Sequence, residues 1–269
     1  MGLARPKVAM APTSDHRPNR PWVLRMTWRD LLFLHLPIAA EAVQETLPAG
    51  LEVDTYGGTA WIGVVPFVMS GVAPRGFPSL PGVSRFPEFN VRTYVRHQGR
   101  SGVWFYSLDA ASRFGVRAAR RFFRLPYFDA RMSVQAEGGE GDRPRVVRYR
   151  SRRTHRGEPP ASFEATVRES GPAERAAPGS LVEWLTERYC LYSASPSGRL
   201  FRGEVAHEPW RLHPVEAEIA EDSLIRAAGF DLTTAAGARG GVAPIAHFSR
   251  ELSVVAWWLR SLGKPVPSS

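Results

Sequence analysis

Apolar and polar residues alternate over several stretches of the chain, with the two-residue period of a β-strand. The alternation is clearest over residues 88–96, and it resumes over residues 103–108 after a turn that contains Gly99. Two alternating runs joined by a short glycine-containing turn predict a β-hairpin. Further strands are predicted over residues 60–69, 189–193 and 200–205.

Helical patterns are short and few. One helix is predicted over residues 39–46, and another after Ser180, which forms a capping box with Glu183 in front of an apolar run. Residues 246–262 fit helical spacing and strand spacing alike, so that segment stays unassigned. The Gly57-Gly58 pair predicts a turn that joins residues 51–54 to the strand at 60–69 in a hairpin. The chain is therefore predicted to be mainly β, in the α+β class.

Composition places most of the chain in one folded domain. Of its 269 residues 43% are hydrophobic, which is enough for a sizeable core. Residues 1–22 are rich in proline and arginine and lack periodicity, so we expect a disordered lead-in, one domain over residues 23–263 and a tail over residues 264–269. The longest strongly apolar run, residues 31–40, is far shorter than the roughly 20 residues of a membrane-spanning helix, so no membrane association is expected.

The single cysteine, Cys190, cannot form a disulfide within the chain. Because the first residues also lack an apolar secretory signal, we expect a cytoplasmic location. Cys190 lies in an apolar strand pattern, which favours a buried and unreactive thiol.

The chain is strongly basic, with a formal net charge of +9. Only Lys7 and Lys264 are lysines among the 35 basic residues, so arginine supplies nearly all of the positive charge. Nucleic acid is therefore an alternative partner, because phosphate backbones favour clustered positive charge.

Two segments carry arginine clusters dense enough for that alternative. A predicted helix from Asp109, its N-cap, to Arg124 has arginines along one face, although a solvated polar face explains the same pattern. In residues 143–156, Arg148, Arg150 and Arg152 alternate onto one face of a predicted strand, and an exposed charged edge strand explains this equally well.

The strand at residues 88–96 has one apolar face and one polar face. Such a pattern suits either solvent or the interior of a barrel, and the residues alone leave both open. The apolar face holds Phe89, Val91, Thr93 and Val95, and the polar face holds Glu88, Asn90, Arg92 and Tyr94.

In a barrel interior this polar face would form a site. Arg92 could bind a substrate carboxylate with two hydrogen bonds, and Asn90 and Tyr94 would complete the substrate-binding face. Glu88, if removed from water, would donate or accept a proton near neutral pH. Buried charges persist only when paired, so Glu88 and Arg92 would need each other or a ligand.

An ordered series of motifs resembles the YqjF-like family of unknown function, in the acetoacetate decarboxylase-like superfamily. The similarity covers roughly residues 25–260. It implies a closed, cone-like antiparallel β-barrel around a small-molecule cavity, with a few peripheral helices. The motifs are Phe33-Leu34-His35, Leu47-Pro48-Ala49-Gly50-Leu51, Trp61-Ile62-Gly63-Val64-Val65-Pro66-Phe67, Glu88-Phe89-Asn90-Val91-Arg92-Thr93-Tyr94-Val95, Ser107-Leu108-Asp109-Ala110, Leu125-Pro126-Tyr127, Glu187-Arg188-Tyr189-Cys190-Leu191-Tyr192 and His207-Glu208-Pro209-Trp210.

The resemblance also indicates which chemistry is missing. The decarboxylase of the superfamily forms a Schiff base with a lysine in a Pro-Lys-Lys motif, and the similar position here reads Pro126-Tyr127. Neither Lys7 nor Lys264 lies near a motif, so imine-forming decarboxylation is not expected. Glu88 is similar to the decarboxylase's pocket glutamate, and with Tyr127 it would form the catalytic pair that moves a proton.

No cofactor or metal is expected, because the seven histidines include no pair at zinc-ligand spacing and no glycine-rich phosphate loop occurs. His35 and His207 could face the cavity, but histidines beside apolar residues are more often structural, and that interpretation is favoured. The expected ligand is a small anionic or carbonyl-bearing compound. The sequence does not separate an enzyme from a binding protein, and it leaves open whether the protein forms a homo-oligomer.

Overall fold

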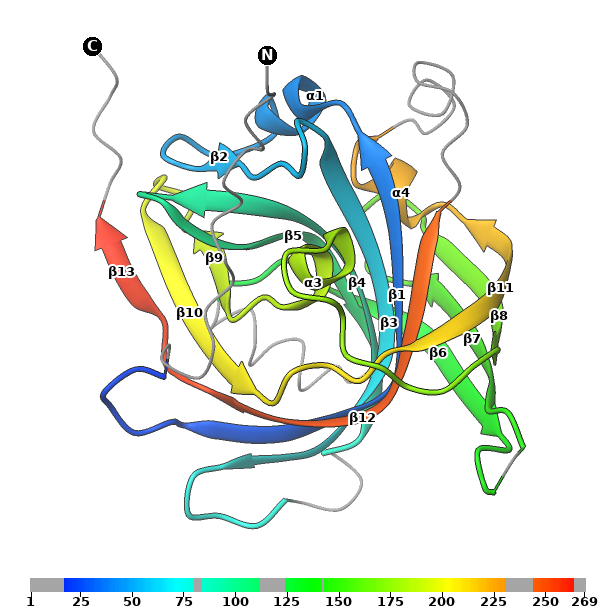
Figure 1. Ribbon diagram of the computed structural model, residues 1–269. Helices are drawn as coiled ribbons and strands as arrows, with labels where there is room; N and C mark the ends of the chain where they lie inside the picture. The colour runs from blue at the N-terminus through cyan, green and yellow to red at the C-terminus, as the bar shows by residue number, and fades with distance from the viewer. Residues whose placement is uncertain (1–16, 80–83, 112–123, 142, 231–243, 264–269) are drawn as a thin grey trace, which may run out of the picture.

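The computed structural model describes residues 17–79, 84–111, 124–141, 143–230 and 244–263, and β-strands dominate this part of the chain (Figure 1). The prediction of a mainly β chain is confirmed. The helices are short: α1 (Ala40–Gln44), α3 (Leu181–Thr186) and α4 (Leu224–Ala227). The strands are β1 (Leu24–Ile38), β2 (Glu52–Val53), β3 (Ala60–Pro74), β4 (Phe86–His97), β5 (Arg100–Ala110), β6 (Tyr127–Glu137), β7 (Val146–Arg153), β8 (Ser162–Glu169), β9 (Cys190–Ala194), β10 (Leu200–His207), β11 (His213–Asp222), β12 (Ile245–Ala256) and β13 (Arg260–Gly263).

Nine of the described strands close into a barrel, in the order β1-β3-β4-β5-β6-β7-β8-β11-β12 and back to β1. The closed barrel implied by the family resemblance is therefore confirmed. The barrel is mixed rather than antiparallel throughout, because β6 runs parallel to β5. A parallel pair cannot be joined by a tight hairpin turn, and a long stretch of sequence separates Ala110, the end of β5, from Tyr127, the start of β6.

A second closed circuit shares part of this barrel. The first half of β5 pairs with β9, β9 pairs with β10, and β10 pairs with β12. β5 has room for two neighbours on this edge because its last residues, 108–110, pair with β6 instead. The strands β12, β1, β3, β4 and β5 belong to both circuits, so they form a wall between two compartments.

One face of the wall lines what we call the apolar compartment. It packs against Val147 and Tyr149 of β7 and Phe163 of β8, and together these side chains form the largest core cluster of the described residues. Strand alternation selects every second wall residue for this face. Its wall members include Leu32, Leu34, Ile62, Val64, Phe89, Val91 and Phe248.

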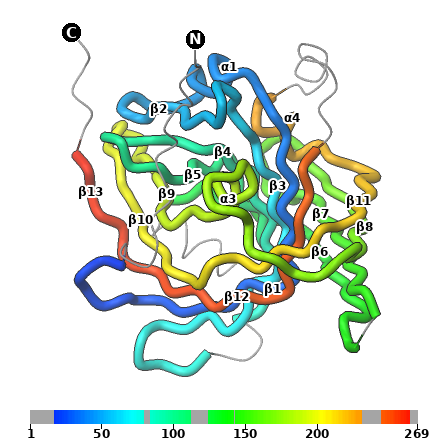
Figure 2. The backbone as a smooth tube through the Cα atoms, in the orientation of Figure 1, coloured from blue at the N-terminus to red at the C-terminus, as the bar shows by residue number. Residues whose placement is uncertain are grey.

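The opposite face lines the polar compartment. Helix α3 contributes Leu185 and strand β9 contributes Leu191, and both pack on Trp61 and Tyr94 of the wall. Figures 1 and 2 show α3 in front of β4 and β5. The wall residues on this face, set by the same alternation, are Phe33, His35, Gly63, Val65, Phe67, Glu88, Asn90, Arg92 and Tyr94.

Most local predictions are confirmed. β4 and β5 form the predicted hairpin, and the turn between them places Gln98 and Gly99 at φ 50° and 76°. Helices α1 and α3 lie where they were predicted, and the Ser180 hydroxyl accepts a hydrogen bond from the Glu183 backbone N–H. Residues 246–262, which fitted two patterns, belong mainly to strands β12 and β13.

Three local predictions are wrong or incomplete. The Gly57-Gly58 turn forms between Tyr56 and Thr59, but β2 pairs with β4 rather than with β3, so no β2–β3 hairpin exists. Asp109 is a residue of β5 and not a helix N-cap, and most of the predicted arginine helix, residues 112–123, lies outside the described residues. The arginine-rich strand β7 is not an edge strand, because it lies between β6 and β8.

Residues 17–22, part of the expected lead-in, contact the folded domain. The Arg20 guanidinium bonds to Glu204 of β10, and the Trp257 indole N–H donates to the Arg20 carbonyl. No helix of the described residues is long and apolar enough to cross a membrane.

Candidate functional site

The polar face of β4 points into the polar compartment, so the interior alternative from the sequence matches the structure. Glu88 and Asn90 are 3% and 4% exposed, Tyr94 is fully buried, and Arg92 is partly exposed. Tyr127, at the first position of β6, is also buried. All five residues predicted for the site therefore lie on one side of the wall.

Glu88 and Tyr127 form the most distinctive contact of the site. The Tyr127 hydroxyl donates a hydrogen bond of 2.9 Å to Glu88 Oε2, across 39 residues of sequence. Burial raises the pKa of the Glu88 carboxyl from its ordinary 4.5 to about 7, although the hydrogen bond from Tyr127 opposes part of the rise. Burial and the nearby Glu88 raise the pKa of Tyr127 well above its ordinary value. Glu88 can therefore gain or lose a proton near neutral pH while Tyr127 keeps its own.

Arg92 has no carboxylate partner among the described residues. Its Nη2 lies 3.5 Å from the Leu185 carbonyl of α3, a long contact, and its guanidinium lies 5.4 Å and 5.8 Å from the ring centres of Phe33 and Tyr94. The sequence allowed an ion pair between Arg92 and Glu88. The described residues show none, and Glu88 bonds to Tyr127 instead. The sequence gave Arg92 two alternative partners, Glu88 or a ligand. Because Glu88 does not pair with Arg92, the ligand alternative remains.

Tyr94 connects the wall to α3. Its hydroxyl donates to the Leu185 carbonyl at 2.8 Å and lies 2.7 Å from His35 Nε2. Since a carbonyl can only accept, the single hydroxyl proton points at Leu185, and His35 must donate from Nε2. Burial, and next the charge of Arg92, lower the pKa of His35 well below its ordinary value. His35 is therefore neutral, with an unprotonated Nδ1.

His35 and Arg92 stand close together because the residue between them is glycine. Gly63 pairs with His35 on one side and with Arg92 on the other. A Cβ atom at Gly63 would lie 3.1 Å from His35 Cδ2 and 3.5 Å from Arg92 Cγ. The close packing of the His35 imidazole and the Arg92 side chain thus depends on the absence of a side chain at Gly63.

Several buried polar atoms on this side of the wall have no hydrogen-bond partner among the described residues. Native proteins leave few such atoms without a partner, since each costs about 1–3 kcal/mol, and water commonly supplies the partner. Both donors and acceptors are present, and donors are in the majority. They are Trp28 Nε1, Trp61 Nε1, Trp210 Nε1, Arg92 Nε, His35 Nδ1 and Asn90 Oδ1.

Aromatic side chains surround the space near Arg92. Trp210 packs edge-on against Phe33, with ring centres 4.9 Å apart, and stacks on Trp28 at 5.9 Å. His207 lies 5.2 Å from Trp210, and burial lowers the pKa of His207 to about 4. Trp210 and His207 occur in a family motif, but the chain pattern assigned neither to the site. His207 ends β10 and Trp210 lies in the connection after it, and both are far along the chain from β4.

The described residues contain no cluster of three or more histidine, cysteine, aspartate or glutamate side chains placed to hold a metal ion. Cys190 is buried, and burial raises the pKa of its thiol, as the apolar strand pattern indicated.

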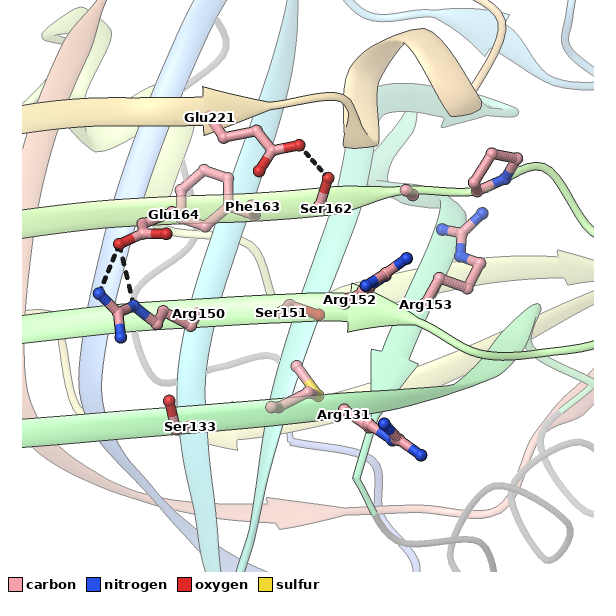
Figure 3. Close-up of a pocket in the computed structure, with 13 residues that line it drawn as sticks. Arg131, Ser133, Arg150, Ser151, Arg152, Arg153, Ser162, Phe163, Glu164 and Glu221 are labelled. Atoms are coloured by element: carbon pink, nitrogen blue, oxygen red, sulfur yellow. Dashed lines mark hydrogen bonds and ion pairs between the residues drawn. The ribbon is translucent and has the colours of Figure 1, made fainter.

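The outer face of β6, β7 and β8 carries the second arginine cluster. A groove of about 640 Å³ lies here, and within it Arg150 pairs with Glu164 while Ser162 bonds to Glu221 (Figure 3). Nearby, Arg153 forms a fully buried ion pair with Asp109. Within the second cluster, Arg148, Arg150 and Arg153 are therefore already paired with carboxylates.

Comparison with known proteins places these observations in a family. Residues 25–253 match the family model DUF2071, described as an uncharacterized conserved protein. The chain is 37% identical over 243 residues to the uncharacterized protein YqjF of Bacillus subtilis (strain 168), covering 90% of this chain and 94% of that protein.

Solved structures with the same fold have low sequence identity. The enduracididine biosynthesis enzyme MppR complexed with pyruvate superposes with a TM-score of 0.60 at 15% identity, covering 98% of this chain and 99% of the other. An acetoacetate decarboxylase-like enzyme from Sphingomonas wittichii RW1 gives a TM-score of 0.59 at 13% identity, covering 91% and 95%. The chain has the acetoacetate decarboxylase-like fold, and it belongs to the DUF2071 family.

Proposed function

We propose that the polar compartment binds a small carboxylate that also bears a carbonyl group, and that Glu88 moves a proton on the bound compound. The observation that carries the proposal is the pair of Glu88 and Tyr127 on the same wall face as Arg92. Glu88 is buried and bonded to a tyrosine, while Arg92 has no carboxylate partner among the described residues. A buried acid of shifted pKa on the same wall face as an unmatched cation is typical of a functional site.

Arg92 is proposed to anchor the carboxylate of the ligand. A guanidinium presents two parallel N–H groups to a carboxylate, and Nε of Arg92 has no partner in the described residues. Phe33 and Tyr94 flank the guanidinium. A surrounding of low polarity strengthens charge-assisted hydrogen bonds.

The ligand is proposed to lie along β4, between Arg92 and Glu88. Residues four apart on a strand are separated by about 13 Å between Cα atoms. A short oxo acid held by its carboxylate at Arg92 would extend its carbon chain toward Glu88. MppR, which shares this fold, binds a compound of this class, pyruvate.

Glu88 is proposed to act as the base. Its carboxylate takes a proton from the carbon next to the carbonyl, the C–H electron pair forms an enolate, and the proton returns from the Glu88 carboxyl to the same carbon or to another acceptor. A pKa of about 7 suits both directions of this transfer at neutral pH. Tyr127 remains protonated, so its hydroxyl orients the Glu88 carboxylate throughout.

Schiff-base chemistry is no part of the proposal. The chain has only two lysines, Lys7 and Lys264, and the position after Pro126 is Tyr127.

We also propose a cytoplasmic location. The thiol of Cys190 has no partner cysteine in the chain, which suits a reducing compartment.

Exchange of pyruvate methyl protons with deuterium, followed by NMR, tests the proton transfer directly. We expect the wild-type protein to accelerate the exchange and Glu88→Gln to lose the acceleration, because glutamine cannot accept the proton. Arg148→Gln, on the exposed face of β7, is the matched control and should exchange like the wild type. Absence of exchange with pyruvate and with a panel of larger oxo acids would reject Glu88 as a base on this class of compound.

Binding is tested separately, by thermal denaturation against small oxo acids and hydroxy acids. A compound that binds the native state raises the melting temperature. Arg92→Ala should weaken an anionic ligand by about 1.5–3 kcal/mol, the usual contribution of a charge-assisted hydrogen bond. Unchanged affinity in Arg92→Ala would remove Arg92 from the site, even if turnover persists.

A further inference from the structure

A second charged hollow lies on the far side of β10 from the polar compartment. Its volume is about 420 Å³, and it is formed where residues 17–20 cross β10 and β13 near the start of β5. β10 and β13 are the yellow and red strands at the left of Figure 1. The hollow is lined by Arg17, Pro18, Asn19, Arg20, Arg100, Arg202, Glu204 and Arg260.

Five guanidinium groups in this hollow face a single carboxylate. Glu204 is 4% exposed, and its Oε1 lies 2.9 Å from Arg202 and 3.9 Å from Arg100, while its Oε2 lies 2.8 Å from Arg20. Arg17 and Arg260 have no carboxylate partner among the described residues. One carboxylate offsets one positive charge, so four positive charges remain in excess.

The fold holds these arginines together despite their repulsion. Arg202 lies directly opposite Arg260 in the ladder of β10 and β13, and like charges in that position are unfavourable. Arg20 is fixed by the Trp257 indole, which donates to its carbonyl at 2.7 Å, and by its own bond of 3.0 Å to the Trp258 carbonyl. Binding of an anion with several charges reduces the repulsion among these arginines.

We propose that this hollow binds a phosphate-bearing small molecule with three or more negative charges, such as a pyrophosphate group. Guanidinium groups match phosphate oxygens with paired hydrogen bonds, and several phosphate charges are needed to balance the excess. The hollow has the volume of a small-molecule site. The pyrophosphate group is either free or part of a nucleoside diphosphate.

This site is separate from the polar compartment. Arg202 and Glu204 flank Gly203 on β10, and strand alternation puts Gly203 on the opposite face. A Cβ atom at Gly203 would lie 3.2 Å from Leu191, which belongs to the polar compartment. The charged hollow therefore faces outward, and its ligand is independent of the proposed reaction at Glu88.

Isothermal titration of the full chain with inorganic pyrophosphate at 150 mM NaCl tests the proposal. We expect saturable binding, weakened at least tenfold by Arg202→Gln combined with Arg260→Gln. The matched control is Arg131→Gln with Arg152→Gln, a second pair of directly opposed arginines, on β6 and β7, which removes the same charge. The control should bind like the wild type. Circular dichroism confirms that both double variants are folded, and Arg202→Lys, which keeps the charge, should weaken binding less than the double variant.

Three results would overturn the proposal: no binding to the wild type, equal weakening by the two double variants, or a single-stranded oligonucleotide that binds more tightly than pyrophosphate and depends on the same arginines. Adenosine diphosphate distinguishes the sources. Binding tighter than that of pyrophosphate assigns the hollow to a nucleotide, and equal binding assigns it to the phosphate groups alone.

Discussion

The two faces of the shared wall use the same strands for opposite purposes. On the apolar side, Phe89 and Val91 of β4 are fully buried among aliphatic and aromatic neighbours. One residue along the same strand, Glu88 and Asn90 are equally buried but polar, and Arg92 has no carboxylate partner in the described chain. Burial alone therefore does not distinguish a core from a site. The distinction is the chemistry of the buried groups: carboxyl and amide side chains on one face of β4 and hydrocarbon side chains on the other.

The apolar face of the sheet therefore contributes mainly to stability, and the polar face carries the proposed function. A buried aromatic or aliphatic side chain contributes about 1.5–3 kcal/mol, whereas a buried polar atom without a partner costs about 1–3 kcal/mol. The apolar compartment thus stabilises the wall, and the buried polar atoms without a partner in the polar compartment reduce that stability. Variants on the two faces should separate the two effects.

The largest effect is expected on the apolar face. Phe89 packs edge-on against Tyr149 and Phe163, with ring centres 6.0 Å and 5.8 Å apart, and Phe89→Ala leaves a cavity among them. The free energy of unfolding should fall by about 3–5 kcal/mol, measured by urea denaturation. Ligand affinity of the remaining folded protein should be unchanged.

Phe67→Ala is the comparison from the other face, since Phe67 is also buried and lies beside Glu88 in the ladder of β3 and β4. It should reduce both stability and ligand affinity. If Phe89→Ala weakened the ligand as much as Phe67→Ala, the two faces would not be functionally separate.

The next effect is a pH dependence carried by Glu88. Its folded-state pKa of about 7 lies above the ordinary 4.5, so between these values the folded protein holds a proton that the unfolded chain has lost. The contribution of Glu88 to stability therefore falls as pH rises from 4.5 to 7 and is constant above, by about 3 kcal/mol in total. Glu88→Gln cannot titrate and can still accept the bond from Tyr127. It should match the wild type near pH 4 and exceed it at pH 8 in urea denaturation. Parallel stability curves for the two proteins would show that Glu88 titrates normally.

The sequence was sufficient to predict that β4 has two different faces, because alternation along a strand is a local property. It could not decide whether the polar face meets solvent, since the groups that cover it, Leu185 of α3 and Leu191 of β9, are about 90 residues further along the chain. The partner of Glu88 was accessible only through the family resemblance, which singled out Tyr127. Nothing local indicated that Arg92 would lack a carboxylate, or that His35 would bond to Tyr94.

The failed predictions have the same origin. The turn at Gly57-Gly58 was identified correctly from its residues, but the partner of β2 is decided by the distant strand β4. The alternation of arginines on β7 was likewise correct, while its place between β6 and β8 depends on the closure of the barrel. Local chemistry specifies turns and faces, and the pairing of strands specifies what each face meets.

The smallest effect compares two fully buried tyrosines, one in each compartment. Tyr149 donates a hydrogen bond of 2.7 Å to the Asp30 carbonyl, and Tyr149→Phe leaves one carbonyl unpaired. Tyr94→Phe leaves the Leu185 carbonyl and the His35 Nε2–H unpaired together. Each unpaired buried group costs about 1–3 kcal/mol, so Tyr94→Phe should be the more destabilising of the two in urea denaturation.

Nitrogen NMR of His35 measures which ring nitrogen carries the proton, a property that a change in packing alone would not alter. The proton should sit on Nε2 in the wild type and in Tyr149→Phe, and this preference should be lost in Tyr94→Phe. If the wild-type His35 ring carried its proton on Nδ1, the inferred direction of the Tyr94–His35 hydrogen bond would be wrong. Nδ1 would then not be an acceptor in the polar compartment.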